Sequence, residues 1–305
     1  MRIALCLPGI VGASNFGMGL GKDIDPRLGH YFHNKNIFEH NDVDVFIHSW
    51  SVDHEKILLD LYNPKDYIVE PQINFGQSTI RDNAIASRWY STAMSVNLKT
   101  EYEKEHGFEY DWVMVYRFDH VFFVPLNFEK FDNQYVYFRH TKPHGWVDGV
   151  RAPEFQSRDW TDTTCDCHTK KWLQAFQAER LRLYDAFFFS SSANVNKIAG
   201  VYEHMTVSDV LHSPHDEIYS QLQRSGLAEA IKFEFFQETE TEALRAYFKN
   251  PEYIPNTKFD IANFERFEEE YVRQNTEVQA RFRLVDADQS KLDKSKSGFN
   301  DMPIQ

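Results

Sequence analysis

Residues 112–123 read Trp-Val-Met-Val-Tyr-Arg-Phe-Asp-His-Val-Phe-Phe. This apolar run is long enough to cross a sheet as a buried strand, and buried strands seldom carry charged side chains. If the chain stays extended, Arg117 and Asp119 point to the same face of the sheet. They would then form an internal salt bridge or deliver a carboxylate to a metal or phosphate site. Alternatively, the strand ends at Tyr116 with both charges in solvent. Open α/β sheets bind ligands beyond their strand ends, which favours the site.

The size and composition of the chain indicate a folded globular protein with one large domain or two modest ones. Of its 305 residues, 42% are apolar, and 26 Phe with 15 Tyr supply the bulk of a substantial core. The net charge of −13 argues against a general affinity for nucleic acid or for anionic membrane surfaces. An acidic protein that binds an anionic ligand needs a local Arg or Lys cluster, or a divalent metal ion, to offset its own field.

The cysteines and the N-terminal segment favour the cytoplasm. Cys6, Cys165 and Cys167 are too few for the disulfide framework of a secreted protein. Residues 1–9 hold only a short apolar run before Pro8 and Gly9, which is typical of a strand rather than of a signal peptide. No apolar stretch is long enough for a membrane span, so we expect no integral membrane segment.

Strand and helix patterns alternate along the chain. We expect strands at residues 2–7, 43–50, 63–71, 110–123, 135–138, 186–190 and 231–236. We expect helices at residues 30–40, 79–105, 172–183, 194–204 and 214–225. This alternation predicts an α/β fold, with a mixed, mainly parallel sheet flanked by helices.

Two stretches depart from that pattern. Residues 141–171 combine prolines, glycines and charges, as a long functional loop would. Residues 259–280 mix acidic and aromatic side chains at helical spacing, which predicts a C-terminal helix, and residues 286–305 are polar enough to be disordered or loosely held. We therefore expect one domain over residues 1–250 and a helical extension with a polar tail over residues 251–305.

Several segments share an order that is known from one group of enzymes. They are an opening strand into a loop with glycines, and then residues 42–50, 87–93, 103–105, 110–113, 117–119 and 185–191. Together, and over roughly residues 1–240, they resemble the GT-A-type glycosyltransferases of bacterial polysaccharide loci and of some viruses. The resemblance implies a single GT-A-like, Rossmann-like domain that transfers a sugar from a nucleotide-sugar donor to a glycan or glycoconjugate acceptor.

The resemblance also implies a metal-binding D-x-D motif at the end of a strand, with Mn²⁺ or Mg²⁺ as the cofactor. This chain departs from the motif, because Arg117 stands where the first Asp is expected and Asp119 is the remaining acid. Either Asp119 binds the metal ion together with diphosphate and water, or Arg117 itself faces the diphosphate and the metal ion is dispensable. The acidity of the chain favours the metal ion.

Inverting transfer needs a base that deprotonates the acceptor hydroxyl. The candidates are Asp148, Asp185, Asp216 and Glu217. Asp185 precedes a buried strand in a family-like segment, so that it would contact sugar hydroxyls or act as the base, unless it is a turn residue. Asp216 and Glu217 open a helix, where capping and the helix dipole explain them without any chemistry.

Candidate nucleotide contacts lie at strand ends and on the long helix. Pro8 and Gly9 begin a glycine-rich loop, although its spacing fits neither G-x-G-x-x-G nor a P-loop. His48 and Trp50 end the second strand, where base or ribose contacts would lie, and structural roles explain them equally well. The candidate partners of the diphosphate are Arg81, Arg88 and Arg117.

Other interpretations remain open. Cys165, Cys167 and His168 are potential zinc ligands, but a fourth is not evident at zinc-finger spacing. The whole chain is alternatively a non-catalytic nucleotide- or carbohydrate-binding protein on the same scaffold, with Arg117 marking a lost metal site. A third class is a different nucleotide-using α/β enzyme, such as a nucleotidyltransferase or a methyltransferase.

Overall fold

The computed structural model describes residues 1–12, 24–77, 79–139, 146–147, 150–151, 183–205, 214–235 and 241–244. The strands in this part of the chain are β1 (Ile3–Gly9), β2 (Val43–Ser49), β3 (Asp66–Val69), β4 (Trp112–Tyr116), β5 (His120–Phe122), β6 (Val136–Arg139), β7 (Trp146–Val147), β8 (Val150–Arg151), β9 (Phe187–Ser190), β10 (Ile231–Phe235) and β11 (Thr241–Ala243). The α-helices are α1 (Pro26–Asn36), α2 (Glu55–Tyr62), α3 (Ile80–His106), α6 (Ser192–Ala199), α7 (Val201–Met205) and α8 (Pro214–Arg224). Short 3₁₀ turns are η1 (Phe38–His40), η2 (Val52–His54), η3 (Phe128–Lys130) and η4 (Ala228–Ala230).

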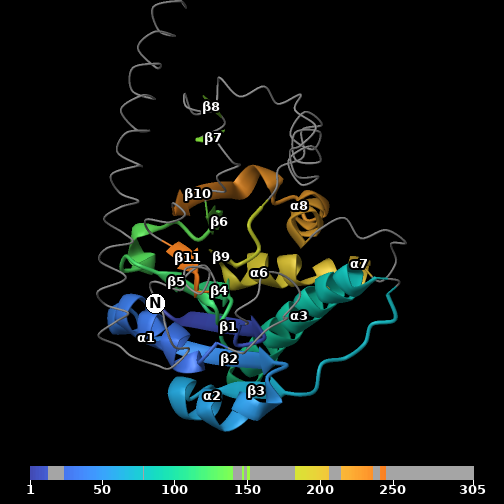
Figure 1. Cartoon of the computed structure of the whole chain (residues 1–305). Coiled ribbons are helices and arrows are strands. Elements are labelled where there is room, and N and C mark those ends of the chain that lie inside the picture. Colours follow the sequence, from blue (N-terminus) through green and yellow to red (C-terminus); the bar gives the residue numbers. More distant parts are fainter. Residues whose placement is uncertain are drawn as a thin grey trace, which may run out of the picture.

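A seven-stranded sheet forms the centre of the fold, in the order β3–β2–β1–β4–β9–β6–β10 (Figure 1). β3, β2, β1 and β4 run parallel, β9 runs antiparallel to both of its neighbours, and β10 is parallel to β6. A separate antiparallel pair joins β5 to β11 just beyond the end of β4. The predicted mixed, mainly parallel α/β sheet flanked by helices is therefore confirmed.

Both faces of the sheet are covered, and a hydrophobic core lies on each. In β1, Ala4 and Cys6 face the core that α3, α6, α7 and α8 share. Ile3, Leu5 and Leu7 face the opposite core, which includes side chains of α2 and of the segment after β5. Successive residues of a strand point to opposite faces, so a strand covered on both sides is apolar throughout. This explains why β1 carries no polar alternation.

The long helix α3 packs across β1 and β2 and runs beside α6 and α7 (Figure 1). Thr79 Oγ1 caps its start by accepting a hydrogen bond of 3.0 Å from the backbone N of Asp82. Gly107 ends it with φ +68°, in the left-handed region that favours glycine at this position. Trp89 and Val96 are buried in the core, as their helical spacing predicts. The helix expected over residues 79–105 is confirmed.

A buried lysine ties α3 to α6. Lys99 Nζ donates to Glu103 Oε2 at 2.8 Å, to Ser192 Oγ at 2.5 Å and to Asn196 Oδ1 at 2.8 Å. Glu103 Oε1 accepts a further hydrogen bond of 2.8 Å from the backbone N of Tyr110, just before β4. Buried charges are tolerated only when they are paired and hydrogen-bonded, so this cluster fixes how α3 lies against its neighbours.

Some helix boundaries differ from the expected ones. The helix expected at residues 30–40 begins earlier, at Pro26, because Asp25 caps it by accepting a hydrogen bond from the backbone N of Arg27. The helix expected at residues 194–204 consists of α6 and α7, with Gly200 between them. The α2 helix was not expected. Its signal was short, with a glutamate in the first turn and Asn63 in the left-handed region at its end.

Other expectations lie outside the described residues. These are the helices at residues 172–183 and 259–280 and the boundary between residues 250 and 251; within 141–171, only β7 and β8 are described. None of the described helices combines the length with the apolar character that crossing a membrane requires.

Candidate functional site

The order of the strands reverses between β1 and β4. From β1 the chain proceeds through β2 to β3 at one edge of the sheet, whereas β4 lies on the other side of β1. Open α/β sheets bind ligands beyond the carboxyl ends of the strands at such a switch point. The residues that follow these two ends, Ile10–Gly12 and Arg117–Asp119, are therefore the first candidates for a binding site.

The turn after β4 buries an acid. The strand expected to run on to Phe123 ends at Tyr116, and His120 N bonds Arg117 O at 3.2 Å to close a turn before β5. Asp119 is only 2% exposed, so its carboxylate does not lie in solvent. The expectation of an extended chain through Asp119 is thus wrong, because the turn interrupts it. The alternative end of the strand at Tyr116 is confirmed, but Asp119 is buried rather than in solvent, and the expected internal salt bridge is present.

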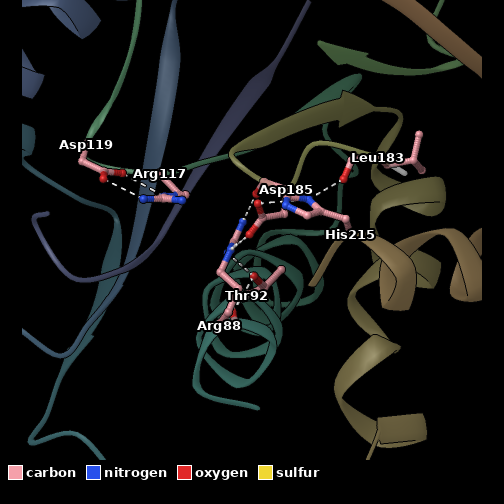
Figure 2. Close-up of polar contacts among 7 residues, drawn as sticks. All are labelled: Arg88, Thr92, Arg117, Asp119, Leu183, Asp185 and His215. Carbon is pink, nitrogen blue, oxygen red and sulfur yellow. Dashed lines mark hydrogen bonds and ion pairs between the residues drawn. The ribbon is translucent and has the colours of Figure 1, made fainter. Parts of the chain in front are cut away.

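Arg117 and Asp119 form a two-point ion pair (Figure 2). Arg117 Nε donates to Asp119 Oδ1 at 2.8 Å and Nη2 donates to Oδ2 at 2.6 Å. Burial alone would lower the pKa of Arg117, but the negative charges of Asp119 and Asp185 outweigh it and raise that pKa. The guanidinium therefore stays charged, and both oxygens of Asp119 are occupied.

The loop after β1 contacts Asp119 directly. A Cβ atom at Gly12 would lie 2.6 Å from Asp119 Cβ, and Gly12 has φ +111°. Both conditions require glycine, so the backbone of the β1 loop approaches the turn after β4 closely. Val11 N donates to Ser51 Oγ at 3.1 Å, which also holds this loop against the end of β2. Residues 13–23, the rest of the glycine-rich loop, lie outside the described residues.

A second buried pair joins α3 to the segment before β9 (Figure 2). Arg88 Nε donates to Asp185 Oδ2 at 3.3 Å, and Nη2 donates to the backbone O of Asp185 at 2.5 Å. Arg88 Nη1 donates to Thr92 Oγ1 at 2.5 Å. Burial lowers the pKa of Arg88, and the charge of Asp185 opposes that effect. Arg117 interacts electrostatically with Asp185, so the two pairs form one cluster of two guanidinium groups and two carboxylates.

His215, the second residue of α8, contacts the same carboxylate. Its Nδ1 lies 2.7 Å from the backbone O of Leu183 and 3.5 Å from Asp185 Oδ1. Because a carbonyl oxygen only accepts, Nδ1 carries a proton and donates it. The ring stacks on Tyr184, with centroids 6.0 Å apart and planes inclined by 16°, and the guanidinium of Arg139 lies 3.4 Å from the Tyr184 centroid. The orientation of the imidazole is therefore fixed.

His48 and Trp50 lie at the end of β2, as expected. His48 is fully buried, with Nδ1 2.7 Å from Ser91 Oγ and Nε2 3.1 Å from Glu70 Oε1, and burial lowers its pKa. These contacts support the structural interpretation of His48. Trp50 stacks on Tyr90 at 5.4 Å, and its buried Nε1 has no hydrogen-bond partner among the described residues.

The remaining predicted residues fall outside the charged cluster or outside the described residues. Pro8 is buried in β1 and Gly9 ends it, Arg81 is exposed in the first turn of α3, and Glu217 is buried on α8. The side chain of Asp216 is not among those described. Asp148, Cys165, Cys167 and His168 lie outside the described residues altogether.

The described side chains do not fit a Mn²⁺ or Mg²⁺ ion as they stand. Mg²⁺ takes about six oxygen ligands, at least one or two of them from carboxylates. Both oxygens of Asp119 already accept from Arg117. The described part of the chain holds no group of three or more His, Cys, Asp or Glu side chains that would bind a metal ion.

Sequence reasoning missed His215 as a member of the site. Its hydrogen-bond partner, Leu183, lies 32 residues earlier in the chain, so no short motif links them. The one available signal was its place between a helix-starting proline and two acids that were themselves candidates.

Comparisons with known proteins add no family to this description. No protein-family model matches the chain, and no curated protein matches it. The function must therefore be argued from the geometry of the site and from the ordered segments of the sequence.

Proposed function

We propose that this protein is a glycosyltransferase that moves a sugar from a nucleotide-sugar donor to a glycan or glycoconjugate acceptor. The observation that carries the proposal is the buried Arg117–Asp119 pair at the switch point of the sheet, in contact with the Gly12 loop. Nucleotides bind at this point in open α/β sheets. The ordered segments that resemble GT-A-type glycosyltransferases support sugar transfer as the reaction.

Arg117 is the group proposed to bind the diphosphate of the donor. A chain with a net charge of −13 needs a local cation to hold that anion and to stabilise it as it leaves. Asp119 holds Nε and Nη2 of the guanidinium, while Nη1 donates to no described residue. The Nη1 edge is therefore the part of the side chain that remains available for a phosphate oxygen.

Arg88 is less suited to that contact. All three of its side-chain nitrogens donate to Asp185 or Thr92. It therefore positions Asp185 beside Arg117. The described carboxylates do not fit a divalent metal ion, so the proposed reaction uses none. Comparing donor binding in Mn²⁺ and in EDTA tests the metal ion that the sequence predicts.

A thermal-shift panel tests the proposal. The full chain is melted with UDP-, GDP-, CMP- and dTDP-sugars, each in Mn²⁺ and in EDTA. We expect one donor class to raise the melting temperature, because a ligand that binds only the folded state stabilises it. We also expect that donor to release its nucleotide on incubation. The absence of a melting shift with every donor would contradict the proposal. A shift seen only in Mn²⁺ would show that donor binding depends on the metal ion.

A non-catalytic nucleotide- or carbohydrate-binding protein is the second candidate. The ion pair that occupies both oxygens of Asp119 favours it, since the carboxylate expected to assist transfer through a metal ion is already engaged. A melting shift without nucleotide release would support this candidate. A shift with S-adenosylmethionine alone would point to a methyltransferase instead.

A further inference from the structure

We infer that His215 is the general base that takes the proton of the acceptor hydroxyl, and that Asp185 is the carboxylate that faces it. This inference rests on the proposed glycosyl transfer and names the residue that makes it possible. The sequence offered only carboxylates for the role. Of these, Asp185 already faces Arg88 and His215, and Glu217 is 8% exposed on α8.

The hydrogen bonding of His215 leaves one ring nitrogen ready to accept a proton. Nδ1 donates to the backbone O of Leu183, so the lone pair of the neutral ring lies on Nε2. Nε2 makes no hydrogen bond to any described residue. The side chain is 33% exposed, so a substrate hydroxyl can approach it from solvent. A base must lie within hydrogen-bond reach of the proton that it removes, and Nε2 meets that condition for an acceptor bound at this surface.

The neighbours of the ring hold it in place. Tyr184 stacks on the imidazole, which limits its tilt, and Leu183 limits its rotation. Asp185 Oδ1 lies 3.5 Å from Nδ1, so a carboxylate faces the ring that is proposed to take the proton. Arg88 in turn holds Asp185 through its other oxygen. General-base catalysis on unrelated folds also pairs a histidine with a buried carboxylate, although there the carboxylate accepts the Nδ1 proton, whereas here Leu183 O accepts it.

Asp185 separates the base from the group proposed to bind the leaving diphosphate (Figure 2). Arg117 N donates to the backbone O of Ala186 at 3.0 Å, one residue after Asp185. Figure 2 shows Asp185 between Arg117 and His215. We therefore place the donor sugar beside Asp185, with its diphosphate towards Arg117. The acceptor hydroxyl would then reach the anomeric carbon from the side of His215, as displacement at that carbon requires.

The step that follows is a direct displacement. The acceptor O–H bond breaks and its proton goes to His215 Nε2. The acceptor oxygen forms a bond to the anomeric carbon while the bond from that carbon to the β-phosphate oxygen breaks. The electron pair of the broken bond leaves with the nucleoside diphosphate, whose charge Arg117 offsets. Transfer by this route inverts the anomeric configuration.

The test uses water as the acceptor, so that no glycan needs to be identified. The probe is the UDP-, GDP- or dTDP-sugar that gives the largest melting shift with the unsubstituted full chain, and the readouts are nucleoside diphosphate release and the first sugar anomer formed, followed by NMR. The variant His215→Asn retains a side-chain N–H that reaches Leu183 O but has no counterpart of Nε2. His215→Ala, assayed with and without added imidazole, checks whether an external base replaces the missing one.

We expect His215→Asn to melt like the unsubstituted chain, to keep its donor shift and to release diphosphate about 10²- to 10⁴-fold more slowly. Imidazole should restore part of the release by His215→Ala, and the first anomer should be inverted. Release by His215→Asn within about threefold of the unsubstituted chain, or a retained configuration, would overturn the role of His215 alone. No donor shift and no release by the unsubstituted chain would overturn the proposed function as well.

Discussion

Arg117 and Lys99 are two buried cations that differ in how completely they are hydrogen-bonded. An ammonium group has three donors, and all three of those on Lys99 are used by Glu103, Ser192 and Asn196. The guanidinium of Arg117 uses Nε and Nη2 for Asp119 and leaves Nη1 without a described acceptor. Full satisfaction of Lys99 indicates a structural role, whereas Arg117 keeps a donor for the proposed contact with a phosphate oxygen.

Substitution of Lys99 tests that distinction through stability. Lys99→Met leaves Glu103 buried without its cation, so we expect the free energy of unfolding in urea to fall by about 3–5 kcal/mol. The double variant Lys99→Met with Glu103→Gln should recover a large part of that loss, because the amide oxygen still accepts from Tyr110 N. In conditions where both variants are folded, the donor shift should persist. A loss below about 1 kcal/mol in the single variant would show that the pair is not structural.

At the scale of elements, the site depends on how closely the β1 loop approaches the turn after β4. Gly12 and Gly9 both have φ in the left-handed region, at +111° and +103°. A Cβ at Gly12 would collide with Asp119, whereas nothing lies within 4 Å of a Cβ at Gly9. Comparing substitutions at Gly9 and Gly12 therefore separates the cost of backbone strain from the cost of the close approach to Asp119.

We expect Gly9→Ala to lower the free energy of unfolding by about 1–2 kcal/mol, the usual cost of a left-handed alanine. Gly12→Ala should carry the same strain plus about 1–3 kcal/mol for the collision with Asp119. It should also weaken donor binding, because Asp119 moves and takes Arg117 with it. Urea unfolding and donor titration of both variants measure these effects. Equal losses in the two variants would contradict the close approach.

The elements that sequence predicted well are those with a local cause. β1 and β4 are largely apolar runs, the centre of β2 is the apolar run 45–47, and α3 has a threonine cap and a glycine end. The direction of β9 was not predictable, because Phe187–Ser190 is buried on both faces and such a strand reads the same in either direction. The break after Tyr116 remained only one alternative at the sequence level, because apolar residues continue on both sides of the turn.

Part of the candidate site could also be predicted, because it has a local signal in the sequence. The charges of Arg117 and Asp119 interrupt an apolar run, which marked them from sequence alone. The ion pair between them was one of the alternatives that the sequence left open. The turn that sets the geometry of the pair could not be predicted from hydrophobic periodicity. His215 and Leu183 meet only through the tertiary fold.

For the molecule as a whole, buried histidines make the folded state sensitive to acid. His33 Nε2 donates to His120 O at 2.9 Å, and Tyr62 Oη donates to Nδ1 at 2.9 Å, so the neutral ring is fully satisfied. Burial lowers the pKa of His33 from 6.5 to about 3, and burial also lowers the pKa of His30 and of His48. The unfolded chain therefore binds more protons than the folded one between about pH 3 and pH 6.5.

Stability should accordingly fall as the pH drops below about 6.5 and should stop falling, for His33, near about pH 3. Between pH 7 and pH 5 we expect His33 to account for about 2 kcal/mol of lost unfolding free energy. The variant His33→Gln cannot titrate and should lose that much less over the same interval, whatever its stability at pH 7. Urea unfolding at both pH values gives the comparison, and identical losses would show that His33 is not neutral in the folded state.

The protein carries a net charge of −13, and the central claim is that Arg117 supplies the cation that contacts an anionic ligand. The direct measurement is calorimetric titration of the nucleoside diphosphate of the best donor, in EDTA. The double variant Arg117→Gln with Asp119→Asn removes the guanidinium without leaving a buried carboxylate. Lys56→Gln with Asp60→Asn makes the same charge change in an exposed pair on α2. We expect the unsubstituted chain and the α2 variant to bind alike, and the Arg117 variant to bind at least about tenfold more weakly. Equal affinity in all three proteins, or binding only when Mn²⁺ is added, would contradict the claim.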